Sequence, residues 1–272
     1  MHEDVIAAAV DDITTAVLEA LGRGVAPTPE SLRLLLRGYA TTGSDEFRDA
    51  LEPTLAHALE LAADSSSTAT PGWLMLFAEA ADASDDARLR EAASNLALKA
   101  RMNWGGAQPI AVSASSVDAC LRALPFLGGD AARAPIDELE RLVAASYEPG
   151  SGIGASLDDE ISVAGALLTA FAVTDRLPYA MLAEELLQHA RVELLKSSAL
   201  PFSTACAAAS AFSRMAALHN VTEYRSAAVI AADADYARDA ACMLERAAGE
   251  ARTLGLAAAS YALAAGELQS AF

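Results

Sequence analysis

Apolar residues recur along this chain every three or four positions, the spacing of one buried helix face. Leu51, Leu55 and Leu59 follow this spacing in one segment, and Leu182 and Leu186 follow it in another. Polar clusters between such segments hold the capping hydroxyls, first-turn acids and prolines with which helices begin. The pattern therefore predicts about twelve helices joined by turns. Their starts are expected at Thr28-Pro29-Glu30, Ser44-Asp45-Glu46, Thr70-Pro71, Ser84-Asp85-Asp86, Ser115-x-x-Asp118, Pro135, Ser156-x-x-Asp159, Pro178 and Pro201.

The same pattern occurs twice without gaps, with an offset of about 132 residues, or roughly three repeats of forty-odd residues. Each copy reads as a helix, a short polar turn and a second helix. A helical hairpin of this size cannot bury its apolar face alone, so we expect stacked hairpins that share one core. The first copy is Leu35-Leu36, Tyr39-Ala40, Thr42, Phe47, Leu55 and His57-Ala58, and the second is Leu167-Leu168, Phe171-Ala172, Thr174, Tyr179, Leu187 and His189-Ala190.

The helices group into hairpins near 29–62, 70–103, 115–147, 157–196 and 201–248, with single helices near 4–22 and 255–270. An open stack of hairpins needs polar helices at both ends. The last helix is instead rich in Leu and Ala, as in Leu256-Ala257-Ala258-Ala259. We therefore predict that the first and last helices pair and close a ring of about six hairpins, an α/α toroid that forms a single domain over residues 1–272.

The composition supports the all-α class and limits the partners. Hydrophobic residues make up 53% of the chain and aromatic residues only 6%, with abundant alanine, which suits close helix packing better than a sheet. The net charge of −18 makes nucleic acid and anionic membrane surfaces poor partners.

The cysteines and the first residues indicate the cellular setting. Cys120, Cys206 and Cys242 lie far apart with no C-x-x-C spacing, so we expect buried free thiols. The chain has no uncharged apolar stretch of membrane-spanning length, and the segment Met1-His2-Glu3-Asp4 is acidic where a signal peptide would be basic. A cytoplasmic protein is expected.

Three segments share their pattern with a known family. They are Pro29-x-x-Leu32-x-x-Leu35-Leu36-Arg37-Gly38-Tyr39-Ala40-x-Thr42-Gly43; Leu157-Asp158-Asp159 followed by Gly165-Ala166-Leu167-Leu168, Thr174-Asp175, Tyr179 and Ala183-Glu184-Glu185-Leu186; and Ser260-Tyr261-Ala262-Leu263-Ala264. Together they resemble the helical part of the thioredoxin-domain, spermatogenesis-associated-type family. That part belongs to the six-hairpin glycosidase-like superfamily, which also holds N-acylglucosamine epimerase-like proteins. The resemblance covers most of the chain and implies a toroid with links to sugar chemistry.

The chain departs from this family in three places. It shows no counterpart of the thioredoxin domain with its paired cysteines. Gly22-Arg23-Gly24-Val25-Ala26 stands where the family has a glycine- and aromatic-rich segment, and Asp64-Ser65-Ser66-Ser67-Thr68 stands where it has a loop with histidine and aromatic residues. No redox activity is therefore expected.

Asp158, Asp159 and Glu160 are the candidate catalytic residues. Toroids of this type bind ligands where the inner helices begin, and these three acids open a predicted helix. Two carboxylates on either side of a glycosidic bond serve as acid and base. Acids in the first turn also stabilise the positive end of the helix dipole, and this capping role is the one we favour.

The candidate ligand-binding residues are aromatic and amide side chains. Trp73 and Trp104 offer flat surfaces for a sugar ring, although burial beside apolar helical sequence explains them as well. Asn103, Trp104 and Gln108 flank a Gly-Gly turn, and Tyr147 ends the third predicted hairpin.

Other kinds of site are not supported. The segment Gly150–Gly154 lacks a preceding strand and a following Lys, and three acids come after it, so a flexible loop is favoured over a phosphate loop. His57 and His189 occupy equivalent repeat positions and are expected to do the same structural work. No metal-ligand spacing and no nucleophile motif is present.

The sequence thus predicts a non-catalytic or degenerate α/α-toroid module without a cofactor. Its expected partner is a small molecule or sugar, another protein or a second copy of the chain. The alternative is a carbohydrate-active enzyme, an isomerase, epimerase or glycoside hydrolase, that uses carboxylates at the mouth of the ring.

Overall fold

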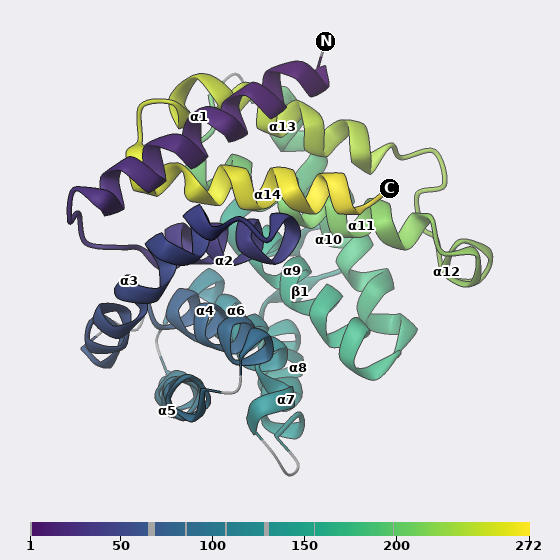
Figure 1. Cartoon of the computed structure of the whole chain (residues 1–272). Helices are drawn as coiled ribbons and strands as arrows, with labels where there is room; N and C mark the ends of the chain where they lie inside the picture. The colour runs from purple at the N-terminus through teal and green to yellow at the C-terminus, as the bar shows by residue number, and fades with distance from the viewer. Residues whose placement is uncertain are drawn as a thin grey trace.

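The computed structural model is predominantly helical, which confirms the all-α class (Figure 1). It describes residues 2–64, 69–84, 86–106, 108–127, 131–154, 156–197 and 199–272. The elements in chain order are α1 (His2–Gly22), α2 (Pro29–Thr42), α3 (Asp45–Ala63), α4 (Thr70–Ala83), α5 (Ala87–Arg101), α6 (Ile110–Arg122), α7 (Leu124–Leu127), α8 (Arg133–Ser146), β1 (Tyr147–Glu148), β2 (Gly152–Ile153), α9 (Leu157–Thr174), α10 (Leu177–Lys196), α11 (Phe202–His219), α12 (Thr222–Ala227), α13 (Tyr236–Ala251), the 3₁₀ helix η1 (Gly255–Ala258) and α14 (Ala259–Ser270).

Two sets of helices alternate along the chain. The helices of the first set, α2, α4, α6, α9, α11 and α14, contact one another in that order, and α14 also contacts α2. Each packs against one helix of the second set, which in the same order is α3, α5, α8, α10, α13 and α1. Figure 1 shows the purple α1 running beside α13 and the yellow α14, so that elements from the two ends of the chain lie together.

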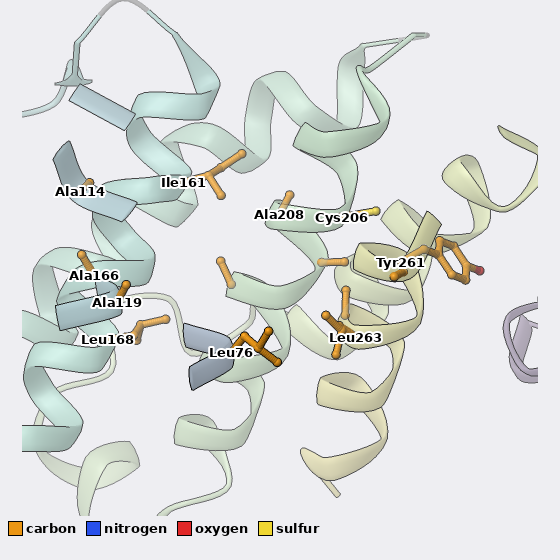
Figure 2. Packing of buried hydrophobic residues seen from close by; sticks show 14 of the residues in the cluster. Leu76, Ala114, Ala119, Ile161, Ala166, Leu168, Cys206, Ala208, Tyr261 and Leu263 are labelled. Carbon is orange, nitrogen blue, oxygen red and sulfur yellow. The ribbon is translucent and has the colours of Figure 1, made fainter. Parts of the chain in front are cut away.

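Small buried side chains allow the first-set helices to approach one another closely. Ala114 and Ala119 of α6 and Ala166 of α9 are fully buried, and Figure 2 shows all three in the region where these two helices meet. The distance between packed helices depends on the side chains at the contact, so alanine permits a short one. The alanine-rich composition is therefore used for packing within the first set.

Larger side chains fill the space between the two sets. Phe212 of α11 is fully buried and stacks on Tyr236 of α13 with the ring centroids 5.9 Å apart. Complete burial of an aromatic or large aliphatic side chain contributes about 1.5–3 kcal/mol. These contacts hold each first-set helix to its partner.

Several helices begin at the positions that their capping residues predict. Thr28 and Ser31 exchange hydrogen bonds at the start of α2, with the Ser31 N–H donating to Thr28 Oγ1 over 3.1 Å and the Thr28 N–H donating to Ser31 Oγ over 3.0 Å. The Ser156 hydroxyl oxygen accepts from the Asp159 N–H at the start of α9. Of the predicted Ser84-Asp85-Asp86 start, Asp85 lies outside the described residues, and Asp86 caps α5.

The helix start predicted at Ser115-x-x-Asp118 is wrong. α6 begins at Ile110, directly after Pro109, so that Ser115 and Asp118 lie inside the helix. The Asp118 side chain does not cap a helix start but pairs with Arg122 one turn later. A carboxylate four residues before an arginine is a stabilising helical pair, and the sequence pattern does not distinguish it from a cap.

The segment predicted to be a flexible loop contains ordered backbone. β1 and β2 form an antiparallel pair in which Tyr147 faces Ile153 and Glu148 faces Gly152. Gly150 and Gly152 have φ angles of 78° and 79°, which glycine adopts without the steric cost that other residues incur. This hairpin precedes α9. Its two strands form the only sheet within the described ranges.

Candidate functional site

The first-set helices enclose a cavity of about 400 Å³, which we call the six-helix pocket. All six helices contribute to its wall, and the serines of α6, α9, α11 and α14 bring hydroxyl groups to it. Its lining includes Glu30 and Arg33 of α2, Met75 of α4, Asp118 and Arg122 of α6, Gly165 of α9, Arg214 of α11 and Glu267 of α14. Pockets of this volume are large enough for small ligands.

One group of charged residues joins α2, α4 and α14. Glu79 Oε1 accepts hydrogen bonds from Arg33 over 2.6 Å and from Arg37 over 2.9 Å, and Arg37 lies 3.7 Å from a carboxylate oxygen of Glu267. Glu267 in turn accepts a hydrogen bond from the Ser210 hydroxyl of α11. Desolvation raises the pKa of Glu79, but the two arginines outweigh it and hold this pKa below its ordinary value.

A second group joins α6, α9 and α11. Arg122 Nε donates to Asp118 Oδ2 over 2.9 Å, and the Thr169 hydroxyl donates to the other oxygen of Asp118. The Arg214 guanidinium donates to Thr169 Oγ1 over 2.7 Å and to the Gly165 carbonyl over 3.0 Å. Asp118 is thus the only acid bonded within this group, which contains two guanidinium groups.

Burial and neighbouring charges shift the pKa values of this group. Desolvation raises the pKa of Asp118, but Arg122, Arg214 and the Thr169 hydrogen bond bring it below its ordinary value. Burial lowers the pKa of Arg214 to about 10, and the charge of Arg122 contributes to the decrease. At neutral pH Asp118 is therefore ionised and Arg214 protonated.

The candidate acids Asp158, Asp159 and Glu160 are not part of the six-helix pocket lining. Asp158 Oδ1 accepts from the Thr204 hydroxyl over 2.7 Å. Asp159 accepts from the Ala111 N–H over 2.9 Å and from the Ser156 hydroxyl over 2.8 Å. These bonds tie the start of α9 to α6 and α11, so both acids have a structural role, and their catalytic role stays a prediction.

Glu160 is buried beneath the β1–β2 turn. Its Oε1 lies 2.7 Å from His189 Nδ1 of α10 and accepts from the Ile153 N–H over 3.3 Å. His57, the repeat equivalent of His189, lies 3.6 Å from Glu60 on its own helix, and this acid is exposed. The expectation that the two histidines do the same structural work is therefore wrong, because only the second repeat has a buried acid beside its histidine.

Three of the predicted ligand-binding residues come together and two do not. Asn103, Trp104 and Gln108 share a cavity with Ser116, but its volume of about 10 Å³ holds no more than a single water molecule. Trp73 is buried in α4 and stacks on Phe77, and the Tyr147 hydroxyl donates to Glu185 over 2.6 Å. A sugar-binding role for these residues stays a prediction.

The sequence patterns do not identify the charged residues of the six-helix pocket. Arg33, Arg122 and Arg214 belong to no recognised motif, and Asp118 resembled a helix cap. Arg214 stands in an alanine-rich run of α11. An arginine that interrupts the apolar face of a helix is the sequence feature that could indicate such a site.

The thiols and the possible metal ligands add no site. Cys120 and Cys206 are buried free thiols as predicted, whereas Cys242 is only partly buried. Burial raises the pKa of Cys206, which lines the pocket, to about 12. No group of three His, Cys, Asp or Glu side chains in the described part of the chain is placed to hold a metal ion.

Among the described residues, no helix has both the length and the apolar character required to cross a membrane. No protein-family model, curated protein or solved structure matches this chain. Its function therefore has to be inferred from its own residues.

We expect the double variant Asp158→Ala with Asp159→Ala to lose about 1.5–4.5 kcal/mol of stability, because it removes the acceptors of three hydrogen bonds that contribute about 0.5–1.5 kcal/mol each. Any ligand affinity of the six-helix pocket should stay the same, because neither acid lines it. Thermal melts and ligand titrations measure both effects. The pair Asp11→Ala with Asp233→Ala removes the same charge from two exposed positions and serves as the control. A stable double variant that loses ligand binding would support the catalytic assignment instead.

Proposed function

We propose that this chain is an α/α toroid of six helical hairpins that binds a small polar molecule in the six-helix pocket without catalysing a reaction there. The contacts between successive first-set helices, including α14 with α2, support the toroid. The observation that carries the binding proposal is the pocket itself, in which all six helices line one cavity of about 400 Å³. A cavity built from so many elements keeps its shape when any one of them moves slightly.

The lining favours a ligand with hydrogen-bonding groups. Serine hydroxyls act as donors and acceptors, and they reach the pocket from four helices. Charged side chains on α2, α6, α11 and α14 add fixed donors and acceptors. A purely apolar ligand would remove water from the hydroxyls and charged groups that face the cavity, at a cost of about 1–3 kcal/mol for each group left without a partner. The serines that line the pocket are Ser115, Ser162, Ser203, Ser210 and Ser260.

The protonation states in the pocket argue against catalysis. General acids and bases work best when their pKa lies near the working pH, which usually requires a raised carboxyl pKa. Asp118 has a lowered pKa and an arginine partner, so it is not a proton donor at neutral pH. The raised pKa of Cys206 likewise prevents it from forming a nucleophilic thiolate.

The alternative is a carbohydrate-active enzyme of the kind that the resemblance to the six-hairpin glycosidase-like superfamily implies. It would require Asp158, Asp159 or Glu160 to face the substrate. The hydrogen bonds of these acids go instead to Thr204, to Ser156 and Ala111, and to Ile153 and His189. We therefore favour binding over turnover.

The proposal predicts that Ala207→Phe abolishes ligand binding. Ala207 lines the six-helix pocket and is exposed, so a phenyl ring at this position would obstruct the cavity without displacing core residues. Binding is measured by calorimetry and thermal shift with monosaccharides, amino acids, dicarboxylates and phosphate esters. The matched control is Ala56→Phe, which places the same ring at an exposed position of α3.

We expect saturable binding of one molecule per chain in the wild-type protein and in Ala56→Phe, and no binding in Ala207→Phe. Binding that survives in Ala207→Phe would place the ligand elsewhere on the protein. Absence of binding by all four classes of compound at millimolar concentration would overturn the proposal. Release of a product from any sugar would favour the enzyme.

A further inference from the structure

Arg122 and Arg214, which we call the arginine pair, occupy a special position in the six-helix pocket. Both line it, and both also line a second cavity together with Leu124, Pro125 and Val173. The two arginines therefore stand between the two cavities. Arg122 is the last residue of α6, and Arg214 lies in the second half of α11.

Arg214 lacks a carboxylate partner. Its hydrogen bonds go to the Thr169 hydroxyl and the Gly165 carbonyl, which are neutral groups. No carboxylate within the described ranges lies within 4.0 Å of its guanidinium, whereas Arg122 pairs with Asp118. A buried guanidinium usually has an anionic partner, because taking it out of water without one is costly.

The charges that line the pocket balance, but they are not evenly paired. Three arginines, Arg33, Arg122 and Arg214, and three carboxylates, Glu30, Asp118 and Glu267, contribute to the lining. Arg33 pairs with Glu79 and Arg122 with Asp118, so Arg214 is the lining arginine without a carboxylate within 4.0 Å in the described ranges.

The pKa of Arg214 is lowered to about 10 at this site. Burial is the largest cause of the decrease and the positive charge of Arg122 is the next, while the charges of Asp118 and Glu267 oppose it. The two guanidinium groups are thus close enough to repel each other. An anion placed against both would relieve the repulsion and supply the missing partner.

We propose that the arginine pair binds an oxyanion, a carboxylate or phosphate group, on the small molecule that occupies the six-helix pocket. This inference rests on the proposed function and names the chemical class of its ligand. Guanidinium groups present forked N–H donors that match the oxygens of carboxylate and phosphate. Serine hydroxyls of the lining, among them those of Ser115, Ser162 and Ser203, can bond to the remainder of the molecule.

The experiment measures the thermal midpoint at pH 7.5 with three probes: inorganic phosphate, succinate and neutral glucose. Sodium chloride at equal ionic strength controls for screening. At about 100 times the dissociation constant, a bound probe should raise the midpoint by about 5–10 °C. Phosphate and succinate distinguish the two sources of an oxyanion.

The variant Arg214→Met removes the charge and keeps most of the side-chain volume. We expect it to weaken anion binding at least about tenfold, as loss of a charge-assisted hydrogen bond does. Arg88→Met removes one positive charge from an exposed site on α5 and should leave binding unchanged. Arg214→Lys keeps the charge without the fork and should bind with intermediate affinity. If Arg214→Met does not fold, Arg214→Lys and Ala207→Phe decide the question.

Saturable binding of phosphate or succinate that is lost in Arg214→Met and Ala207→Phe would support the inference. Anion binding that is equal in wild-type protein and Arg214→Met would overturn it. Binding of glucose alone, blocked in Ala207→Phe, would overturn the anion inference and leave the proposed function intact. If none of the three probes binds, the anion inference fails, and the wider set of compounds then decides the proposed function separately.

Discussion

Replacement of Glu184 by alanine is expected to lower the free energy of unfolding by about 3–5 kcal/mol, the usual cost of removing one partner from a buried ionic network. Glu184 lies on α10 and has no solvent exposure. Its carboxylate accepts hydrogen bonds from Tyr224 Oη over 2.8 Å, Tyr236 Oη over 3.3 Å, the Ile230 N–H over 2.9 Å and the Ala231 N–H over 3.1 Å, and lies 2.9 Å from His219 Nε2.

These bonds explain why the loss should be large. The carboxylate ties α10 to the chain between α11 and α13, which carries the short helix α12. Without it, two buried tyrosine hydroxyls and two backbone N–H groups at a partly buried site lose an acceptor. Each unsatisfied buried group costs about 1–3 kcal/mol.

Glu185→Ala is the matched control for this prediction. Glu185 is the next residue on α10, is only partly buried and accepts a single hydrogen bond, from the Tyr147 hydroxyl. Its removal should cost about 1 kcal/mol. Urea denaturation of both variants gives the comparison. Equal losses would show that the network around Glu184 contributes no more than one ordinary hydrogen bond.

The pH dependence of stability provides a second readout for Glu184. Desolvation raises its pKa, but the Ile230 and Ala231 N–H groups, the Tyr224 hydroxyl and the charge of His219 together bring the pKa below its ordinary value. A carboxyl with a lowered pKa in the folded state stabilises the protein above its unfolded pKa, and this contribution is lost as the pH falls through the folded value. The stability difference between wild-type protein and Glu184→Gln should therefore be constant near neutral pH and shrink below about pH 4.5.

Local chemistry made much of the fold predictable. Hydroxyl and carboxylate caps act on N–H groups within three residues, so Thr28 and Ser156 mark the starts of α2 and α9 without any knowledge of the tertiary structure. The helical spacing of leucines depends on the same short range. The pattern at Ser115 and Asp118 predicts a helix start wrongly, because an acid four residues before an arginine is also stable inside a helix.

The site could not be predicted in the same way. Glu184 and Glu185 are adjacent and chemically identical, and only the tyrosines 40 and 52 positions further along distinguish them. Arg122 and Arg214 likewise meet only because α6 and α11 both line the six-helix pocket. Helical periodicity identifies the polar face of one helix. It does not indicate which polar residues on other helices will contact that face.

Gly152→Ala is expected to cost substantially more than Gly150→Ala, although the two glycines have nearly the same φ angle, 79° and 78°. That angle should cost any replacement about 1–3 kcal/mol at either position. At Gly150 an added Cβ meets nothing within 4 Å, whereas at Gly152 it would lie 1.8 Å from Glu160 Oε1 and 2.9 Å from His189 Nδ1. The overlap should add about 1–3 kcal/mol for Gly152→Ala alone. Denaturant unfolding of the two variants isolates this difference.

A double-mutant cycle identifies the origin of the extra cost. Glu160 is buried and held by His189 and the Ile153 N–H, so its carboxylate cannot move away from a new methyl group without breaking these bonds. In a Glu160→Ala background the extra cost of Gly152→Ala over Gly150→Ala should largely disappear, which gives a coupling energy of about 1–3 kcal/mol between the two positions. If the extra cost persists without the carboxylate, it arises from the backbone of the β1–β2 turn, and Glu160 does not determine the choice of glycine at position 152.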